Sequence, residues 1–481
     1  MQRACSATTN RVRPCHAATP LAAALALCFC AGSEAATITV NDAGEGSVAG
    51  KCTLTDAVAA LNTAAPKNAC AAGDGNADTI SLSFFTTPTT IAFSLPSVGD
   101  ANSALVLSKP VAIRAGLDAA GNPLVTLMRS SVSGTPGFRL ISTASDLSVT
   151  GVVLQNGMAA DRGGAIYAGD NANVALVDSG VTANSAASSG GGIAANCGNV
   201  TLTRSMISGN QAGKNGGGVY AANHANATTL CESTITLHHS SVTGNAASTG
   251  SGGGIYSFNG HVYGYYATLD SNSAGGLTGG GIYAYYSISL FACTVSNNSV
   301  GNSGGGVAAH GYIGLTNSTV AGNSASQSAV GADAIGIYSS TISANIGAGM
   351  YATGGVSFLS AATIVGSIIQ GNTGNNLTGE VHAAGSNNII GPDPSGGSID
   401  YPPGSVDCDA KLGLLADNGG PTRTIALQDG SCAIDAGPLG ASVPSDQRGT
   451  RFARKVGAAT DIGAFEFQSN DRIFFDGFGG P

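Results

Sequence analysis

Two short motifs alternate along the middle of the chain at a nearly constant spacing, and this internal repeat restricts the possible folds more than any other feature. One motif is a glycine run followed by an aliphatic residue and often by Tyr, as in residues 252–256. The other has the pattern Ser/Thr-x-aliphatic-x-x-Asn, and successive copies lie 22 to 28 residues apart, with one gap of 35. Its asparagines are Asn156, Asn184, Asn210, Asn245, Asn272, Asn298, Asn323, Asn345 and Asn372. The chain therefore repeats a unit of about 26 residues.

The composition of the repeat unit favours strands. The units are rich in Gly, Ser, Thr, Val and Asn, and short runs such as residues 200–203 alternate apolar and polar residues as half-buried strands do. Leucine-rich repeats share this period but need Leu at fixed positions, and helical repeats need helix-forming residues. About 26 residues accommodate three short strands and three turns. The sequence therefore predicts an all-β fold, a right-handed parallel β-helix over residues 111–392.

The two motifs have a physical role in such a stack. Equivalent residues of successive coils lie about 4.8 Å apart, so the repeated asparagines are expected to form a ladder of amide hydrogen bonds. The aliphatic residue three positions before each Asn is expected to point into the core. The glycine runs permit positive φ or a close approach between backbones, where a Cβ would clash.

Both ends of a coil stack need covering, because exposed strand edges pair with other molecules. Residues 53–61 predict a short amphipathic capping helix with Thr53 as its N-cap and Asp56 three residues later. We expect this helix and the first strands to occupy residues 36–110.

Residues 1–35 have the features of an export signal. Three arginines precede an apolar run of 11 residues that is too short to span a bilayer, and Ser33 and Ala35 suit a signal peptidase. Cleavage after Ala35 removes three Arg and one Glu, so the net charge changes from −9 to −11. A chain with this charge is not expected to bind nucleic acid or anionic membranes. The rest of the chain has no apolar run long enough for a transmembrane helix. We expect a secreted protein or one at the outer cell surface.

Seven cysteines follow the predicted signal peptide, and in an oxidising compartment most of them are expected to pair. We expect Cys52 to pair with Cys70 and Cys408 to pair with Cys432, one pair near each end of the body. The pairing of the three central cysteines stays open: Cys197, Cys231 and Cys293. No Cys-x-x-Cys occurs after the signal, so no metal site is expected.

Two stretches resemble families of exported β-helix proteins. Gly-Gly-Ala-Ile at 163–166, with the aliphatic-x-x-Asn pattern, resembles the repeats of polymorphic outer membrane proteins, which form β-helices and include adhesins. Residues 38–57 are similar to the Cys-Ser-Leu-Arg-Glu-Ala domain that opens many secreted bacterial β-helix proteins. In that hexapeptide Cys52, Leu54 and Ala57 match. These resemblances imply a secreted β-helix protein.

Four motifs in the C-terminal region resemble the choice-of-anchor Q domain. They lie in order at 417–424, 433–437, 446–449 and 461–466. The resemblance assigns residues 393–466 to that domain, and it implies an extracellular repeat protein with no enzymatic activity. The tail at 467–481 contains Ile-Phe-Phe-Asp-Gly-Phe and resembles a short C-terminal signature of some Gram-negative secreted proteins, so it is a candidate sorting element.

Parallel β-helices also include polysaccharide lyases and glycoside hydrolases, so an enzyme of this class is the alternative. Such sites need two carboxylates around the bond, or a carboxylate cluster with a basic residue. Across residues 157–380 no two carboxylates are adjacent, and Asp161, Asp170 and Asp178 fall in different parts of about one coil. The sequence therefore predicts a protein that is not an enzyme and that needs no cofactor and no metal. A C-terminal charge cluster that includes Asp446, Arg448, Arg451 and Arg454 is expected to be an ion-paired cap rather than a site for an anionic polymer.

Tyrosines are the better candidates for binding. Tyr follows the aliphatic residue of several glycine motifs, so by alternation it should face outward. The candidate binding residues are Tyr220, Tyr256, Tyr263, Tyr265, Tyr266, Tyr283 and Tyr285. Exposed Tyr rings could stack on sugar rings or on a partner protein; alternatively they form a structural ladder between coils. We expect a non-catalytic protein that acts in adhesion or binds an extracellular glycan or the surface protein of a host or neighbouring cell.

Overall fold

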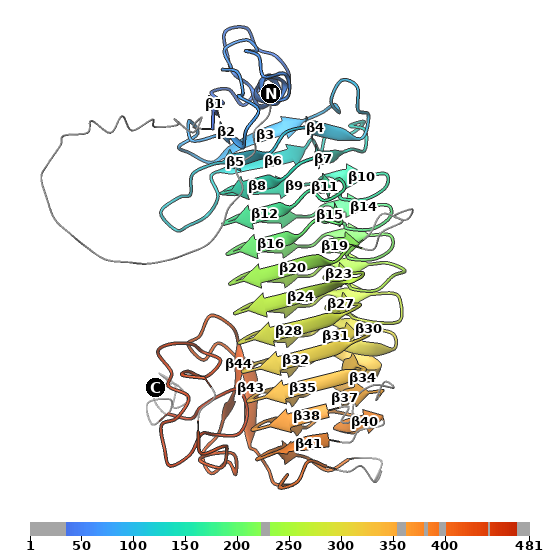
Figure 1. Ribbon diagram of the computed structural model, residues 1–481, viewed down its shortest axis with the longest axis vertical. Coiled ribbons are helices and arrows are strands. Elements are labelled where there is room, and N and C mark those ends of the chain that lie inside the picture. Colours follow the sequence, from blue (N-terminus) through green and yellow to red (C-terminus); the bar gives the residue numbers. More distant parts are fainter. Residues whose placement is uncertain are drawn as a thin grey trace, which may run out of the picture. The chain divides into compact units, whose positions relative to one another are not determined.

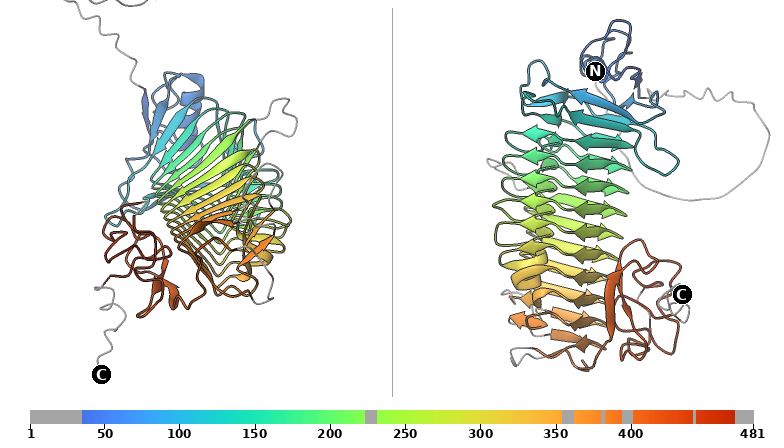
Figure 2. Two further views of the ribbon diagram at one scale, coloured as in Figure 1. Left: turned by 60° about the horizontal axis from the view of Figure 1, so that its bottom comes forward. Right: turned by 180° about the vertical axis from the view of Figure 1, so that it is seen from behind.

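The computed structural model describes residues 35–222, 231–353, 362–379, 383–393, 401–440 and 443–468. In these ranges the chain winds into a rod of stacked coils, and the coils contribute strands to three parallel sheets that run along the rod (Figures 1 and 2). The predicted all-β parallel β-helix with a short N-terminal helix is confirmed. The predicted export signal, up to residue 34, and the tail from residue 469 lie outside the described residues.

Each coil passes from sheet 1 to sheet 2, then to sheet 3, and so to the next coil. Sheet 1 consists of β1 (Thr37–Thr39), β2 (Asp78–Ser81), β5 (Val111–Arg114), β8 (Leu147–Thr150), β12 (Val174–Val177), β16 (Val200–Thr203), β20 (Ser233–His238), β24 (Gly260–Tyr265), β28 (Ser287–Phe291), β32 (Tyr312–Thr316), β35 (Ala334–Tyr338), β38 (Ala362–Val365) and β41 (Ala383–Ser386). Sheet 2 consists of β3 (Thr89–Phe93), β6 (Val125–Arg129), β9 (Val152–Gln155), β13 (Gly180–Thr182), β17 (Met206–Ser208), β21 (Ser241–Thr243), β25 (Thr268–Asp270), β29 (Thr294–Ser296), β33 (Thr319–Ala321), β36 (Thr341–Ser343), β39 (Ile368–Gln370) and β42 (Ile389–Ile390).

Sheet 3 has two short strands in many of its coils. It consists of β4 (Ser103–Leu107), β7 (Arg139–Thr143), β10 (Met158–Ala159), β11 (Ile166–Ala168), β14 (Ser185–Ala186), β15 (Ile193–Asn196), β18 (Gln211–Ala212), β19 (Val219–Ala222), β22 (Ala246–Ala247), β23 (Ile255–Ser257), β26 (Ser273–Ala274), β27 (Ile282–Ala284), β30 (Ser299–Val300), β31 (Ser303–Ala309), β34 (Ser324–Ala332), β37 (Ile346–Ala352) and β40 (Leu377–Gly379). Sheet 1 already includes β1 and β2, so the parallel stack begins well before residue 111.

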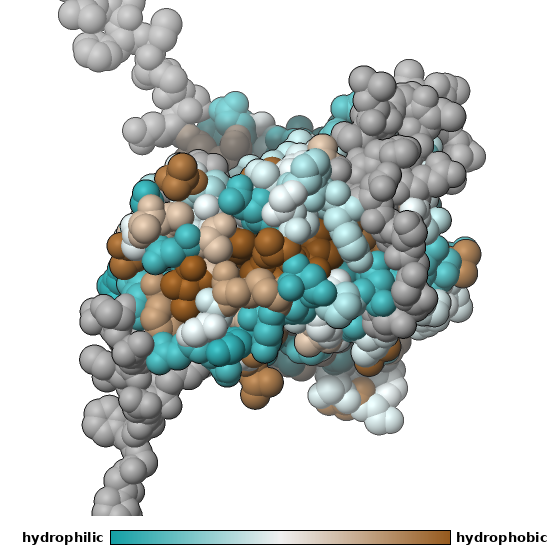
Figure 3. All heavy atoms as spheres, turned by 90° about the horizontal axis from the view of Figure 1, so that it is seen from below, coloured by the Kyte–Doolittle hydropathy of each residue, from teal (hydrophilic) through white to brown (hydrophobic). Residues whose placement is uncertain are grey.

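The core consists of aliphatic columns inside the rod. Val181, Ile207 and Val242 occupy the middle of three successive sheet 2 strands, lie in register and are fully or almost fully buried. Burying each such side chain contributes about 1.5–3 kcal/mol, which is the main favourable term in the stack. Viewed along the rod from its C-terminal end, apolar residues gather in the middle and hydrophilic ones surround them (Figure 3).

The motif asparagines form a buried hydrogen-bonded column after the sheet 2 strands. Asn245 Nδ2 donates to Asn272 Oδ1 at 2.9 Å, and Asn272 Nδ2 donates to Asn298 Oδ1 at 2.9 Å. The same pattern links every motif asparagine from Asn184 to Asn372. Placing Asn156 in this ladder is wrong. Gly157 N donates to Asn184 Oδ1, so Gly157 takes the ladder position, whereas Asn156 lies one residue earlier with a φ of 63°.

The glycine runs mark the closest approach between coils. Gly216 has a φ of 65°, a conformation that side chains rarely adopt. A Cβ on the next residue, Gly217, would lie 2.3 Å from the carbonyl oxygen of Gly253 in the following coil. Any side chain there would push two coils apart, which explains why the run recurs.

The serine of the second motif forms another column, at the corner between sheets 1 and 2. Ser318 Oγ donates to the carbonyl oxygen of Thr316 at 2.9 Å and accepts from Cys293 N at 3.1 Å. Cys293 takes the serine position in its own coil, where its Sγ accepts from Ala267 N at 3.4 Å. Cys293 is buried and is the free cysteine of the described residues.

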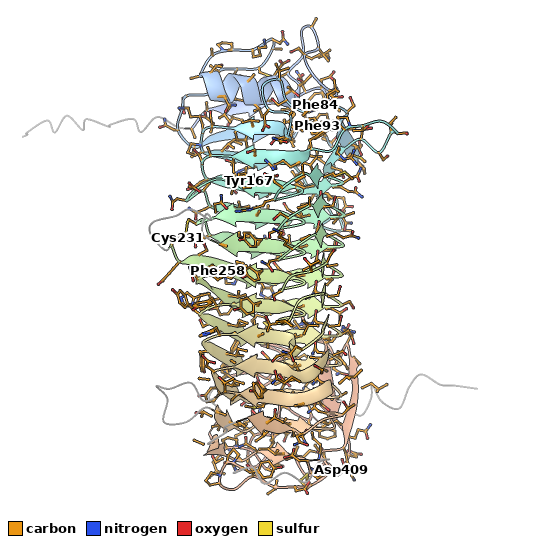
Figure 4. All side chains as sticks on the ribbon, turned by 90° about the vertical axis from the view of Figure 1, so that its right-hand side faces the viewer. Phe84, Phe93, Tyr167, Cys231, Phe258 and Asp409 are labelled. Atoms are coloured by element: carbon orange, nitrogen blue, oxygen red, sulfur yellow. A yellow bond between two sulfur atoms is a disulfide. The ribbon has the colours of Figure 1, made fainter. Side chains whose placement is uncertain are left out.

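The N-terminal end of the stack is covered by α1 (Leu54–Thr63), as Figure 4 shows at the top of the rod. Thr53 caps the helix, because its hydroxyl accepts from Asp56 N at 3.3 Å. The Asp56 carboxylate also accepts from Ser47 Oγ at 2.6 Å and from Asn68 Nδ2 at 2.7 Å. These bonds fix the cap to the loops around it. No helix among the described residues is long and apolar enough to cross a bilayer.

Three disulfides join all the described cysteines except Cys293. Cys52 is bonded to Cys70, and Cys408 to Cys432, as the sequence predicts. The third disulfide joins Cys197 to Cys231. Cys231 directly follows residues 223–230, which lie outside the described residues and account for most of the extra length of the 35-residue repeat. Such bonds indicate an oxidising or extracellular environment.

The C-terminal region forms a unit that lies along sheet 2 (Figures 1 and 2). It contains the antiparallel strands β43 (Leu412–Ala416) and β44 (Thr424–Leu427). Gln447 is fully buried between this unit and the rod, where Nε2 donates to the Cys293 carbonyl at 3.1 Å and Oε1 accepts from Thr319 Oγ1 at 2.6 Å. The unit therefore covers the outer face of sheet 2 from β29 onward, and it also reaches the end of β25, where Arg423 forms an ion pair with Asp270 at 2.7 Å.

Candidate functional site

Aromatic rings of three successive coils form a stack on the outer face of sheet 3. Tyr220, Tyr256 and Tyr283 lie in register in β19, β23 and β27. Their ring centroids are 5.5 and 5.1 Å apart, with interplanar angles of 9° and 20°. The stack ends at both sides, because the register partners beyond it are Ala194 and Ala308. Half-buried rings stacked at the coil spacing form a flat apolar surface.

The stack continues around the corner between sheets 3 and 1. The rings of Tyr256 and Phe258 are 6.5 Å apart, and Phe258 lies 5.5 Å from Tyr285. Tyr285 in turn stacks on His310 of the next coil, at 4.8 Å and 12°. His310 Nδ1 lies 3.5 Å from a carboxylate oxygen of Asp333. Figure 4 shows Phe258 on this part of the rod, directly outside the sheet.

Further rings lie on the outer face of sheet 1. His238 and Tyr265 occupy paired positions of β20 and β24, with rings 4.9 Å apart and 10° between planes. The ring of His261 is 6.1 Å from that of Tyr263 and 5.6 Å from that of Tyr286. We call the combined set the aromatic surface: Tyr220, His238, Tyr256, Phe258, His261, Tyr263, Tyr265, Tyr283, Tyr285, Tyr286 and His310.

A trough of about 430 Å³ lies on sheet 1, on the N-terminal side of the aromatic surface. Small outward side chains line it, among them Ala112, Ser148, Ala175 and Thr201, which are paired in register from strand to strand. The register continues from Thr201 through the next coil to Tyr263. The trough and the aromatic surface therefore form one continuous track along the rod.

An exposed polar ladder flanks the trough. Asn173 Nδ2 donates to Asp146 Oδ1 at 3.0 Å, and Asn173 Oδ1 accepts from Asn199 N at 2.9 Å. Asn199 Oδ1 accepts from Thr234 N at 2.8 Å. These groups provide donors and acceptors along one wall of the track.

Burial affects the ionisation of the stacked tyrosines. Desolvation raises the pKa of Tyr256, and the neighbouring phenols of Tyr283 and Tyr220 raise it further. Burial also raises the pKa of Tyr220 and of Tyr283. All three hydroxyls therefore stay neutral at physiological pH and keep a proton to donate.

The predicted tyrosines do not share one stripe. Tyr220, Tyr256 and Tyr283 lie on sheet 3 and Tyr285 at the next corner, whereas Tyr263 and Tyr265 lie on sheet 1. Tyr266 lies beyond them, at the corner with sheet 2, where its ring stacks on His239 at 4.9 Å. Tyr263 and Tyr265 occupy outward positions of β24, whereas Tyr266 follows the end of this strand, where the chain turns toward sheet 2.

Histidines are the members that sequence reasoning missed. Every histidine in the described part of the chain lies against an aromatic ring: His238, His239, His261 and His310. The repeat spacing could have revealed them: His238 and Tyr265 are 27 residues apart, about one coil, so their side chains are expected to lie side by side.

Among the described residues of the rod, Asp161 and Asp178 do not converge. Asp161 forms an ion pair with Arg139, and Asp178 pairs with Arg204 at 2.6 Å. Within the described ranges no group of three or more His, Cys, Asp or Glu side chains is arranged to hold a metal ion. In the C-terminal unit, Asp446 and Arg448 form a buried ion pair at 2.7 Å.

Comparisons with known proteins found similarity in structure but not in sequence. No family model matches the chain, and no curated protein matches it in sequence. A crystal structure of the pectate lyase Pel9A is similar, with 13% sequence identity and a TM-score of 0.44, over 90% of this chain and 96% of that one. At this identity the likeness concerns the fold.

This match corrects one prediction. The sequence predicts a protein that is not an enzyme, whereas the similar solved structure is an enzyme.

Proposed function

We propose that this protein is exported and binds neutral glycan chains along sheet 1 and the aromatic surface. The observation that carries this proposal is the continuous set of rings from Tyr220 to His310, which lies next to a trough of small and polar side chains. A glycan chain lying along the rod would meet a ring at one end of the track and hydroxyl or amide groups at the other.

The chemistry of the track favours sugars. Sugar rings have apolar faces that pack on aromatic rings, and their hydroxyls require many donors and acceptors. Tyr263 and Tyr285 supply half-exposed rings, while Asn173, Asn199 and Thr201 supply polar groups along the trough. The ring column and the polar ladder run in the same direction, so one extended ligand could use both.

The charge distribution favours a neutral glycan over a polyanion. The chain from residue 36 onward has a net charge of −11, which repels polyanions. Close to the aromatic surface, Arg162 lies 5.8 Å over the Tyr220 ring and Asp333 lies beside His310. One charge of each sign at opposite ends gives no cationic patch for an acidic polymer.

The place of action is part of the proposal. Three disulfides favour an oxidising compartment. The signal-like residues 1–35, the choice-of-anchor Q-like region 393–466 and the tail at 467–481 would give export and attachment, and the repeats resemble those of polymorphic outer membrane proteins. Glycan binding at the cell surface would serve adhesion to a host or neighbouring cell.

Affinity electrophoresis in gels containing single polysaccharides tests the proposal. The native protein should be retarded by at least one neutral polysaccharide, and Tyr263→Ala and Tyr285→Ala should lose most of that retardation. Tyr351→Ala is the matched control, because Tyr351 lies on sheet 3 in the register column of Tyr283 but three coils beyond it. No retardation by any neutral polysaccharide, or equal retardation of all three variants, would contradict the proposal. The proposal would also be contradicted if the protein bound only another protein and no polysaccharide.

A further inference from the structure

A second groove, of about 290 Å³, lies at the corner between sheets 1 and 2. Its floor is the outer face of sheet 2, where Gly180, Met206, Ser241 and Thr268 occupy one register column. Pro123 from an N-terminal loop and Pro421 from the C-terminal unit also line it. The groove occupies the part of sheet 2 that these two segments leave open.

The corner residues of four successive coils border this groove. Asp178, Arg204, His239 and Tyr266 each follow a sheet 1 strand and have φ values of 47°, 46°, 48° and 52°. This left-handed conformation is uncommon for residues with side chains, and its recurrence aligns the four side chains along one edge of the groove. The column therefore presents a carboxylate, a guanidinium and two rings in sequence.

Arg204 has one edge of its guanidinium occupied and the other free. Nε donates to Asp178 Oδ1 at 2.6 Å, and Nη2 donates to Asp178 Oδ2 at 2.7 Å. This side-on pairing uses two of five N–H groups, so both N–H groups of Nη1 and one of Nη2 remain. The Arg204 side chain is 57% exposed. The remaining edge has the parallel donor geometry that binds a carboxylate with two hydrogen bonds.

The two rings form a platform beside the guanidinium. His239 and Tyr266 stack at 4.9 Å with 5° between their planes. Ser241 and Thr268 place hydroxyls on the floor next to them. The groove has a carboxylate of its own only in Asp178, which Arg204 already neutralises.

We propose that this groove is a separate binding site for a hexuronate, a sugar residue that carries a carboxylate. The carboxylate would bind the free edge of Arg204, the sugar ring would pack against the stacked pair of His239 and Tyr266, and its hydroxyls would meet Ser241 and Thr268. Asp178 acts as a positioning residue, because it holds the guanidinium in one orientation without meeting the ligand. The volume of about 290 Å³ is at the lower limit of ligand pockets and suits one sugar residue rather than a long chain.

Titration of the native protein with free glucuronate, followed by saturation-transfer NMR, tests the site. Glucose is the neutral probe of the same size. We expect glucuronate to bind at least about tenfold more tightly than glucose, since the carboxylate adds two charge-assisted hydrogen bonds. Equal affinity for the two sugars, or no saturation by glucuronate, would overturn the proposal.

Variants locate the binding. Arg204→Lys keeps the charge but loses the two parallel N–H donors of the guanidinium. Asp178→Asn removes the carboxylate that orients Arg204. Each variant should weaken glucuronate binding about tenfold. Arg114→Lys is the control, because Arg114 is exposed at the end of β5 and does not line the groove. Tyr263→Ala should leave glucuronate binding unchanged, which separates this site from the proposed glycan track. Unchanged binding in Arg204→Lys would overturn the assignment, and so would loss of binding in Arg114→Lys or Tyr263→Ala.

Discussion

The rings of Tyr256 and Tyr283 stack at 5.1 Å because β23 and β27 are paired in register. A repeating sequence thus produces a repeating surface, here with one ring of this stack in each of three successive coils. The same register aligns the buried asparagines and the corner residues. The effect of a substitution should therefore depend on the contacts that the residue makes with its register partners in the neighbouring coils.

Asn272→Ala should destabilise the rod strongly. Its amide accepts from Asn245 Nδ2 and donates to Asn298 Oδ1, both at 2.9 Å, and all three residues are fully buried. Removing it leaves buried donors and acceptors without partners, which costs about 3 kcal/mol. Urea denaturation measures this as a lower midpoint. Asn199→Ala is the control, because Asn199 belongs to the exposed ladder, and an equal shift in both variants would contradict the account.

Gly253→Ala should be destabilising for a different reason. A Cβ at Gly253 would lie 2.4 Å from the carbonyl oxygen of Gly280, so two coils must separate. Overpacking of this kind costs about 1–3 kcal/mol. In Gly301→Ala the added Cβ would meet its nearest atom at 3.6 Å, and the thermal midpoint of that variant should stay close to that of the native protein. A midpoint of Gly253→Ala no lower than that of Gly301→Ala would show that the close approach is unimportant.

Cys293 should resist alkylation in the folded protein. Burial raises the pKa of its thiol to about 12, so at pH 8 the thiol is protonated as well as inaccessible. Mass spectrometry after treatment with iodoacetamide should find no label at Cys293 in the native state and full label after unfolding. Rapid labelling of the native protein would be inconsistent with the buried column. The Cys293→Ser variant confirms the position of the label.

Glu466 should make the stability of the C-terminal unit depend on pH. Burial raises its pKa from 4.5 to about 7, so the folded state holds the proton more tightly than the unfolded state. The stabilising contribution is complete below pH 4.5 and is lost as the pH rises through 7. The temperature of the thermal unfolding midpoint should therefore decrease as the pH rises from 5 to 8. Burial also raises the pKa of Asp461, which acts in the same direction.

Glu466→Gln tests this assignment. The amide cannot ionise, so the midpoint should change less with pH, although its value drops because Asp461 N loses an acceptor that lies at 2.8 Å. Glu232 is exposed, and Glu232→Gln should keep the full pH dependence. An unaltered pH slope in Glu466→Gln would refute the role of this carboxyl group.

The sequence predicts the repeating parts of this fold well. The spacing of the asparagines gives the coil length, and alternation places Tyr256 outside and Ile255 inside. The error at Asn156 has a local cause, because Gly157 interrupts the motif there and shifts it by one residue. The capping helix was predictable because its signals, Thr53 and the following apolar residues, are adjacent in sequence.

Contacts between distant segments were not predictable from the sequence. Gln447 meets Thr319 across 128 residues, and no local pattern fixes that pairing. The ion pair of Arg204 with Asp178 depends on corner conformations that repeat one coil apart. The repeat motifs do not include the histidines, so the spacing of 27 residues between His238 and Tyr265 indicates a ring contact only once the strand register is known.

The most direct test of glycan binding is hydroxyl-radical footprinting of the protein with and without a neutral polysaccharide that retards it. Bound glycan should reduce oxidation at Tyr263, Tyr265 and Tyr285, because these rings form the proposed contact. Oxidation at Tyr351 and Tyr401 should stay the same, since both lie outside the aromatic surface. Protection of all tyrosines alike, or of Tyr351 and Tyr401 alone, would contradict the proposal that sugars bind on this surface.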